Sequence, residues 1–467
     1  MRNCPWKSFF WLALLSGVVL AFAFPPFHVP DEPSHFFRSY QISTGKILAE
    51  KRHLTTGGTL PKSLGRVALA FTEGVIFHAD KKIPLERICR EASIELAVNE
   101  TEFTAFSNTA IYSPLPYLPQ AAAIGLGAWL KLPPVLLLYA GRMSNLLCAI
   151  AIITLAIRIT PLYKWVFFLT ALSPMNVHLM ASLSADALTN AVAMILTAQI
   201  FKYSFDDSFR LKHIDLVILM ILSIILALCK PGYSLLTVLY FLIPRCRIGP
   251  THVYLLWGLS ICGLALGCSI IWSHLVNDLF NAPYEIGGIM PSQQLHMILL
   301  HPWAFLVKCY ENIRHYWLFY GSSFIGILGW LDLRLPQFFY LIHGSVMLIT
   351  IMFSGNPDIS VNPQRRILLL SVAVLNIITI ITSCYLMWTP VWQEEISPAQ
   401  GRYFLPFAVP GFLVFYSRNR IVLHGKELLA LFLPSYVLIS LFLVVANVIS
   451  RYYGDWRVFS HLACMLF

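Results

Sequence analysis

Residues 9–24 read FFWLALLSGVVLAFAF, and the motif Pro30-Asp31-Glu32-Pro33-Ser34-His35 follows shortly after them. A helix of about 20 apolar residues crosses the roughly 30 Å hydrocarbon layer of a bilayer, so this run predicts a first membrane span. Arg2 and Lys7 precede it, which favours a cytoplasmic N-terminus. Ala21-Phe22-Ala23 also fits a signal-peptide cleavage site, but the acidic motif is outside the cytoplasm in either case.

The rest of the chain repeats this pattern. The sequence has 467 residues, of which 57% are hydrophobic and 12% charged, whereas soluble domains have about a quarter charged residues. Further apolar runs lie at 114–130, 135–157, 162–180, 185–201, 214–229, 233–243, 253–275, 335–353, 367–387, 404–416 and 428–448. They predict an all-α, polytopic membrane protein that forms a single domain over residues 1–467, with about 11 to 13 membrane helices.

The positive charge is concentrated in short connections. The net charge is +10, yet residues 28–112 contain ten acidic and ten basic side chains, so the excess lies elsewhere. Basic residues gather at 202–212, 245–247, 365–366 and 418–426. This distribution indicates cytoplasmic loops of a membrane protein and offers no basic groove for a nucleic acid.

Two ways of counting the spans place Asp186 differently. Counting back from the basic connections places residues 182–186 and 388–402 outside, on the same side as Asp31. Counting forward from the first span places Asp186 inside. We prefer the backward count, because it rests on four separate basic loops. Pro133-Pro134 and Arg142 suggest that the miscounted crossing is a short or re-entrant piece between residues 114 and 157.

Residues 28–112 form one long extracytoplasmic loop that is large enough to contain helices. Pro33 suits the first turn of a helix, and residues 84–98 mix apolar and charged side chains as an interfacial helix does. Cys89 is the only cysteine in this loop. No pair or cluster of cysteines has zinc-site spacing, and most of the ten cysteines lie in apolar runs as small buried hydrophobes.

The motif at the start of the loop offers groups for catalysis. On a helix, Asp31, His35 and Arg38 would share one face, with Glu32 beside them. A carboxylate at the membrane surface can take a proton from an incoming hydroxyl or hold a divalent cation against a phosphate. The alternative is that Asp31 and Glu32 only cap a helix N-terminus.

Two more charged positions are candidates for substrate binding. Asp186 lies in Ser182-Leu183-Ser184-Ala185-Asp186, at the start of an apolar run. A carboxylate near lipid is energetically costly, which favours a functional role for Asp186. The alternative is that it only caps the N-terminus of a helix. With Asp31, it is a candidate ligand of a divalent cation. Lys230 lies between two apolar runs and can pair with a lipid phosphate.

Aromatic and basic residues mark two further segments. In Gly401-Arg402-Tyr403-Phe404-Leu405-Pro406, arginine can bind phosphate with two parallel hydrogen bonds, and Gly401 would allow close approach to a head group. Tyr112, in Tyr112-Ser113-Pro114-Leu115-Pro116-Tyr117, can line a groove for a polyprenyl chain. Both segments also suit simple anchoring at the membrane interface.

Taken together, these motifs resemble the GT-C superfamily of membrane glycosyltransferases. In order and spacing, the four segments around Asp31, Tyr112, Asp186 and Arg402 are most similar to a bacterial family of predicted membrane proteins placed in that superfamily. The resemblance implies a sugar donor linked to polyprenyl phosphate and a cell-envelope glycan, lipid or protein as acceptor. It also implies inversion at the anomeric carbon and an active site facing outward from the bacterial inner membrane.

The resemblance also implies residue roles. Asp31 corresponds to the catalytic base or metal ligand of the first loop, with Glu32 as the alternative, and Arg402 to the residue that meets the donor phosphate. A transporter or flippase for lipid-linked glycans is one alternative function. A polymerase or ligase that joins preassembled glycans is another.

Overall fold

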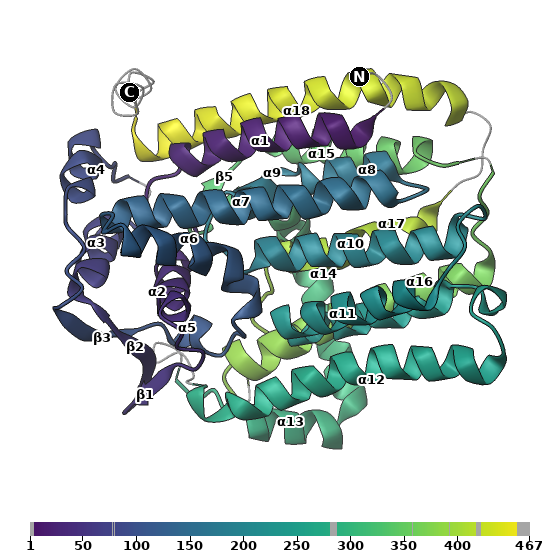
Figure 1. Cartoon of the computed structure of the whole chain (residues 1–467), viewed down its shortest axis with the longest axis horizontal. Coiled ribbons are helices and arrows are strands. Elements are labelled where there is room, and N and C mark those ends of the chain that lie inside the picture. The colour runs from purple at the N-terminus through teal and green to yellow at the C-terminus, as the bar shows by residue number, and fades with distance from the viewer. Residues whose placement is uncertain are drawn as a thin grey trace.

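The computed structural model describes residues 4–76, 78, 80–280, 287–356, 358–391, 393–416 and 422–454, and most of them are helical (Figure 1). Its α-helices are α1 (Pro5–Ala23), α2 (Glu32–Ser43), α3 (Lys62–Thr72), α4 (Leu85–Ala92), α5 (Ser107–Ala110), α6 (Leu118–Trp129), α7 (Pro134–Ile159), α8 (Lys164–Ala171), α9 (Pro174–Met180), α10 (Asp186–Phe205), α11 (His213–Cys229), α12 (Thr251–Leu275), α13 (Pro291–Leu300), α14 (Pro302–Gly326), α15 (Gln337–Phe353), α16 (Pro363–Trp388), α17 (Leu405–Phe412) and α18 (Val422–Tyr452). The 3₁₀ helices are η1 (Leu115–Tyr117), η2 (Pro231–Leu242), η3 (Arg245–Arg247), η4 (Asn277–Leu279), η5 (Gly401–Phe404) and η6 (Leu413–Phe415). The strands are β1 (Glu50–Arg52), β2 (Thr55–Pro61), β3 (Thr101–Ala105), β4 (Ile327–Leu328) and β5 (Leu333–Arg334).

Long apolar helices dominate the molecule and confirm the predicted polytopic fold. Within the described ranges, five helical stretches are long and apolar enough to cross a membrane: α1, α7, α12, α16 and most of α18. Several other apolar helices are shorter, among them η2, an unusually long 3₁₀ helix. In Figure 1 the long helices run side by side in roughly the same direction.

The long first loop, residues 28–112, folds at one end of the helices, on the left in Figure 1. It contains an antiparallel sheet with the strand order β1-β2-β3, which the sequence did not suggest. A Cβ atom on Gly57 would lie 2.0 Å from the Thr104 carbonyl oxygen, so glycine permits the close approach of β2 to β3. The interfacial helix expected at 84–98 is shorter, because α4 ends at Ala92.

The basic connections meet at the opposite end of the molecule. Arg247 pairs with Asp207, and the guanidinium of Arg365 lies over the ring of Phe205. The start of α1 belongs to this end, since Arg158 at the end of α7 lies over the Trp6 ring. Of the basic segment at 418–426, residues 418–421 and the side chains of 422–426 lie outside the described part.

The spans between residues 114 and 180 explain why the two counts disagreed. Helix α6 has 12 residues and rises only about 18 Å, so it is too short to cross, and it packs against the full-length α7. The chain then returns through α8 and α9, which are separate helices with Pro174 at the start of α9. This path brings Asp186 to the end of the helices where the first loop lies, as the backward count predicted.

Candidate functional site

Asp31 is the residue just before α2. Its backbone is left-handed, with φ 60°, a conformation that aspartate tolerates better than most residues. The carboxylate makes no capping hydrogen bond; instead, Oδ1 accepts one from Nδ2 of Asn108 at 2.8 Å. The side chain is 40% exposed. The geometry therefore argues against the capping alternative for Asp31.

Asp186 and two cations complete a cluster around this carboxylate. Lys230 Nζ lies 2.9 Å from Asp186 Oδ1. Arg402 lies between the two carboxylates, with Nε 3.7 Å from Asp186 Oδ2 and Nη2 3.9 Å from Asp31 Oδ2. We call Asp31, Asp186, Lys230 and Arg402 the charge cluster.

Arg402 retains unused hydrogen-bonding capacity. Its side chain is only 5% exposed, and its Nε has no hydrogen-bond partner among the described residues. Both carboxylates lie beyond normal hydrogen-bond distance of it, and Nη2 donates to the Tyr403 hydroxyl at 3.3 Å. A buried cation with an unsatisfied donor is suited to receive an anionic oxygen.

Two tyrosines border the charge cluster. Lys230 Nζ lies 4.1 Å from the centre of the Tyr403 ring, within the range of a cation–π contact. Tyr112 lies close enough to interact electrostatically with Lys230, Tyr403 and Asp186. Desolvation raises the pKa of Tyr112 to about 12, so its hydroxyl remains protonated at neutral pH and can donate a hydrogen bond.

An open groove includes Pro231 and Gly232, the two residues that follow Lys230 in sequence. It has a volume of about 560 Å³ and is lined by Pro231, Gly232, Leu266, Ser269, Ile270, Ser273, His274, Asn277, Thr379 and Ser383. These residues belong to η2, α12, η4 and α16. The groove therefore lies between helices and begins at the residue after Lys230.

A comparison with family models matches residues 14–410 to a family described as "Predicted membrane protein (DUF2142)". The matched range is most of the chain. The chain belongs to the DUF2142 family. It is a multi-pass membrane protein, and all members of the charge cluster fall within the matched range. No curated protein and no solved structure matches it.

Glu32 is separated from the charge cluster of this DUF2142 protein, although it is next to Asp31 in sequence. Its side chain has no exposed surface. Arg142 Nε donates to Oε1 at 2.8 Å, Arg142 Nη2 donates to Oε2 at 2.6 Å, and the Leu183 amide also donates to Oε1. Because its lone pairs are engaged and substrate cannot reach it, this placement does not support the expectation that Glu32 substitutes for Asp31 as the catalytic carboxylate.

Asp31 precedes α2 in a left-handed conformation, so it is not on one helical face with His35 and Arg38. His35 nevertheless lies close enough to interact electrostatically with Asp31, Asp186, Arg402 and Lys230. His35 Nδ1 hydrogen-bonds the Tyr117 hydroxyl at 2.8 Å, and burial lowers the pKa of His35 to about 4, so it is neutral at pH 7. Arg38 is buried and donates to Gln41 and to the carbonyl oxygens of Ile47 and Tyr112. These contacts hold residues 38–47 and Tyr112 together, while Arg38 Nε has no hydrogen-bond partner among the described residues, so the predicted substrate contact stays a prediction.

The role expected for Gly401 is also corrected. A Cβ atom on Gly401 would lie 2.2 Å from the Tyr320 carbonyl oxygen and 2.3 Å from the Phe324 nitrogen. Its own amide donates to Ser323 Oγ at 2.7 Å. Glycine is needed here for η5 to pack against α14, and not for the approach of a head group.

A divalent cation does not fit the charge cluster as it stands. No group of three or more histidine, cysteine or acidic side chains able to hold a metal occurs in the described part of the chain. Asp31 and Asp186 are the two acidic candidates, but the Arg402 guanidinium lies within 4 Å of both carboxylates. A shared metal ion would have to displace that guanidinium, so no chemical step below is assigned to a metal.

Two polar residues of α7 were not predicted as part of the site. Arg142 was visible as a charge inside an apolar run, but it suggested a break in the span rather than an ion pair. Asn145 follows one helical turn later and hydrogen-bonds the 182–184 segment. One feature of the sequence could have indicated their joint role: Arg142 and Asn145 are three residues apart, so they share one face of a helix.

Proposed function

We propose that this protein is a membrane glycosyltransferase. It would move a sugar from a polyprenyl-phosphate-linked donor to an acceptor outside the cytoplasm, with inversion at the anomeric carbon. The observation that carries the proposal is the position of Asp31: a partly exposed carboxylate that faces a buried arginine with an unsatisfied donor. The resemblance to GT-C glycosyltransferases supplies the donor class.

The reaction assigns separate tasks to the members of the charge cluster. Asp31 accepts the proton of the acceptor hydroxyl or amide as that group attacks the anomeric carbon. The bond from that carbon to the phosphate oxygen breaks, and polyprenyl phosphate leaves with the bonding electrons. Arg402 and Lys230 stabilise the negative charge on the leaving phosphate, while Asp186 orients both cations.

We assign the groove next to Lys230 in sequence to the lipid chain of the donor; its lining combines Pro231, Leu266 and Ile270 with serine, threonine, histidine and asparagine side chains. It lies between η2, α12 and α16, and α12 exposes large apolar side chains such as Leu259, Ile270 and Ile271. A phosphate at Lys230 would therefore continue into a groove bordered by apolar helices. The lipid-linked donor can remain in the bilayer while its sugar reaches Asp31.

The same layout supports an outward-facing site in a bacterial inner membrane. The basic connections lie at the end of the molecule opposite to the charge cluster, which suits the positive-inside rule. We propose an extracytoplasmic glycan, lipid or protein of the cell envelope as acceptor. A ligase or polymerase would use the same donor and differ in the acceptor.

Glycan profiling of a deletion strain tests this function. Loss of one envelope decoration, with accumulation of its lipid-linked sugar, identifies donor and acceptor together. Purified protein in lipid vesicles should then release polyprenyl phosphate from that donor. A donor that crosses the bilayer without cleavage would instead identify a flippase and overturn the proposal.

An arginine variant examines the phosphate contact in the same assay. Arg402→Lys keeps the charge but loses the two-pronged geometry, and a hydrogen bond to a charged group contributes about 1.5–3 kcal/mol. Release should fall roughly 10- to 100-fold. Arg247→Lys, at the opposite end of the molecule, is the matched control and should leave release unchanged. Equal activity of both variants would remove Arg402 from the site.

A further inference from the structure

We propose that Arg142 and Asn145 of α7 are positioning residues. They hold two separate segments, residues 30–35 and 182–186, in fixed register and so determine how Asp31 and Asp186 face each other. The consequence for transfer rests on the proposed function; the structural coupling does not.

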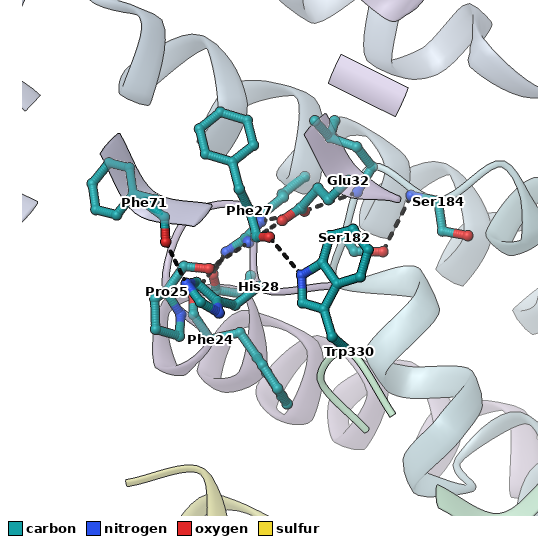
Figure 2. A network of polar contacts seen from close by, with 12 residues as sticks. Phe24, Pro25, Phe27, His28, Glu32, Phe71, Ser182, Ser184 and Trp330 are labelled. Carbon is teal, nitrogen blue, oxygen red and sulfur yellow. Dashed lines mark hydrogen bonds and ion pairs between the residues drawn. The ribbon is translucent and has the colours of Figure 1, made fainter. Parts of the chain in front are cut away.

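Arg142 fixes the first segment through an unusually complete set of contacts. Its guanidinium binds both Glu32 oxygens and donates to the backbone oxygens of Ala21 at 2.6 Å, Phe24 at 2.9 Å and Pro25 at 3.0 Å. Figure 2 shows Phe24, Pro25 and Glu32 within this network of polar contacts. Arg142 thus links the end of α1 and the residues after it to the side chain of Glu32, the residue that follows Asp31.

The second segment is held by the same face of α7. Asn145 Nδ2 donates to the Ser182 oxygen at 2.7 Å and to the Ser184 oxygen at 3.1 Å. The amide between them, that of Leu183, donates to Glu32 Oε1 at 3.3 Å. The peptide group between Ser182 and Leu183 is therefore bound by both Asn145 and Glu32, and the peptide group after Ser184 is bound by Asn145.

Packing reinforces these hydrogen bonds. A Cβ atom on Gly141 would lie 2.5 Å from Leu183 Cδ2, so the segment rests directly on the α7 backbone. Ser184 Oγ accepts from the Asp186 amide at 3.2 Å, which links the gripped peptides to the first residue of α10. A site supported by a long helix holds its geometry better than one supported only by loops.

The spacing of the two α7 residues explains the coupling. Arg142 and Asn145 are three residues apart and project from one side of the helix. Glu32 connects them, because it binds the first and receives the Leu183 amide from the segment held by the second. Loss of Arg142 should therefore loosen both segments, whereas loss of Asn145 should loosen only residues 182–186.

Hydrogen–deuterium exchange of the full-length protein in detergent micelles tests the coupling without substrate. In Arg142→Lys, peptides covering both 30–35 and 182–186 should exchange at least about tenfold faster. In Asn145→Leu, only the second group should change. Unchanged exchange at 182–186 in Arg142→Lys would overturn the proposal, and so would equal loosening of both segments by Asn145→Leu.

A second buried arginine provides the matched control. Arg451 binds Asp332 and donates to the Lys81 oxygen, and it contacts neither segment. Arg451→Lys should loosen its own surroundings and leave residues 30–35 and 182–186 unchanged. If Arg142 had only a general structural role, both arginine variants would affect both segments alike.

Kinetics then separate positioning from simple support of the fold. Misplacement by about 1 Å can cost roughly 10²-fold in rate, so kcat should fall by that order in Arg142→Lys while KM changes less than about threefold. If Arg142→Lys does not reach the membrane, Asn145→Leu provides the same comparison. Loosened segments with an unchanged kcat would overturn the positioning role. A wild-type protein without transfer activity would instead overturn the proposed function, and the exchange results would still decide the coupling.

Discussion

Asp31 and Glu32 are neighbours in sequence, yet they belong to opposite kinds of charged environment. Glu32 has no exposed surface, and its carboxylate is paired at 2.6–2.8 Å with an arginine that is also fully buried. Asp31 is 40% exposed and lies 3.9 Å from Arg402. The first arrangement leaves no group free for a ligand, while the second leaves both charges able to take a new partner.

This difference separates a structural ion pair from a candidate reactive site. A buried pair with saturated hydrogen bonds is strongly destabilised when one partner is removed, because the other charge remains unpaired. A loose, partly exposed pair gives little stability but can exchange its partners for substrate groups. Changing each carboxylate should therefore affect a different property of the protein.

The largest effect is expected for Asp31→Asn. Loss of a general base lowers the rate roughly 10²- to 10⁴-fold. Asparagine tolerates the left-handed backbone at this position, so the substitution should not disturb the fold. Polyprenyl-phosphate release should fall by that factor with the amount of membrane protein unchanged. Asp207→Asn, at an almost fully exposed carboxylate on the opposite end, is the control. Near-normal release by Asp31→Asn would exclude Asp31 as the base.

Glu32→Gln should instead lower stability. It leaves the buried Arg142 without its counter-charge, and breaking such a pair costs about 3–5 kcal/mol. Thermal unfolding in detergent should show this loss, and the double variant Glu32→Gln with Arg142→Gln should recover part of it. A stable Glu32→Gln variant that has lost transfer would reverse the roles assigned to the two carboxylates.

Much of this arrangement follows from the sequence, for identifiable reasons. Long apolar runs predict membrane spans, because a helix needs a nearly fixed length to cross the bilayer. The basic connections predict on which side of the membrane Asp186 lies, because positive charge along the whole chain follows one rule. The order of the motifs indicated that Asp31, Asp186 and Arg402 act in one site, but it gave Lys230 no place among them. The structure supplies the distances.

Other features depend on tertiary contacts that local patterns do not encode. A helical face containing Asp31, His35 and Arg38 assumes that Asp31 is already helical, but Asp31 precedes α2 and its backbone is left-handed. Arg142, the partner of Glu32, is 110 residues away in the chain, so no local sequence pattern predicts this ion pair. The sheet formed by β1, β2 and β3 depends on the close approach of two strands at Gly57, in a loop for which the sequence indicated only helices.

His35 and His28 extend the comparison to pH. Burial lowers the pKa of each to about 4, below the ordinary value of 6.5. On acidification the histidines of the unfolded chain therefore take up protons at a higher pH than those of the folded protein. The free energy of unfolding falls as the pH drops from about 6.5 to 4, by about 3 kcal/mol for each histidine.

Unfolding measured across this pH range should show that loss, and His35→Asn should reduce it. Asparagine can preserve the hydrogen bond to the Tyr117 hydroxyl but does not titrate. A stability profile of His35→Asn parallel to that of the wild type would show that His35 does not contribute.

The smallest expected effect concerns metal removal. A divalent cation about 4 Å from the Arg402 guanidinium would be repelled by about 8 kcal/mol at an effective dielectric constant of about 20, and Lys230 would add to this. Asp31 and Asp186 are already neutralised by these two cations, so EDTA should change release of polyprenyl phosphate less than about twofold. Activity that is lost in EDTA and restored by Mg²⁺ or Mn²⁺ would mean that a metal displaces Arg402 during turnover. In that case Arg402→Gln should bind the metal more tightly than the wild type, because removing the competing charge removes most of the repulsion.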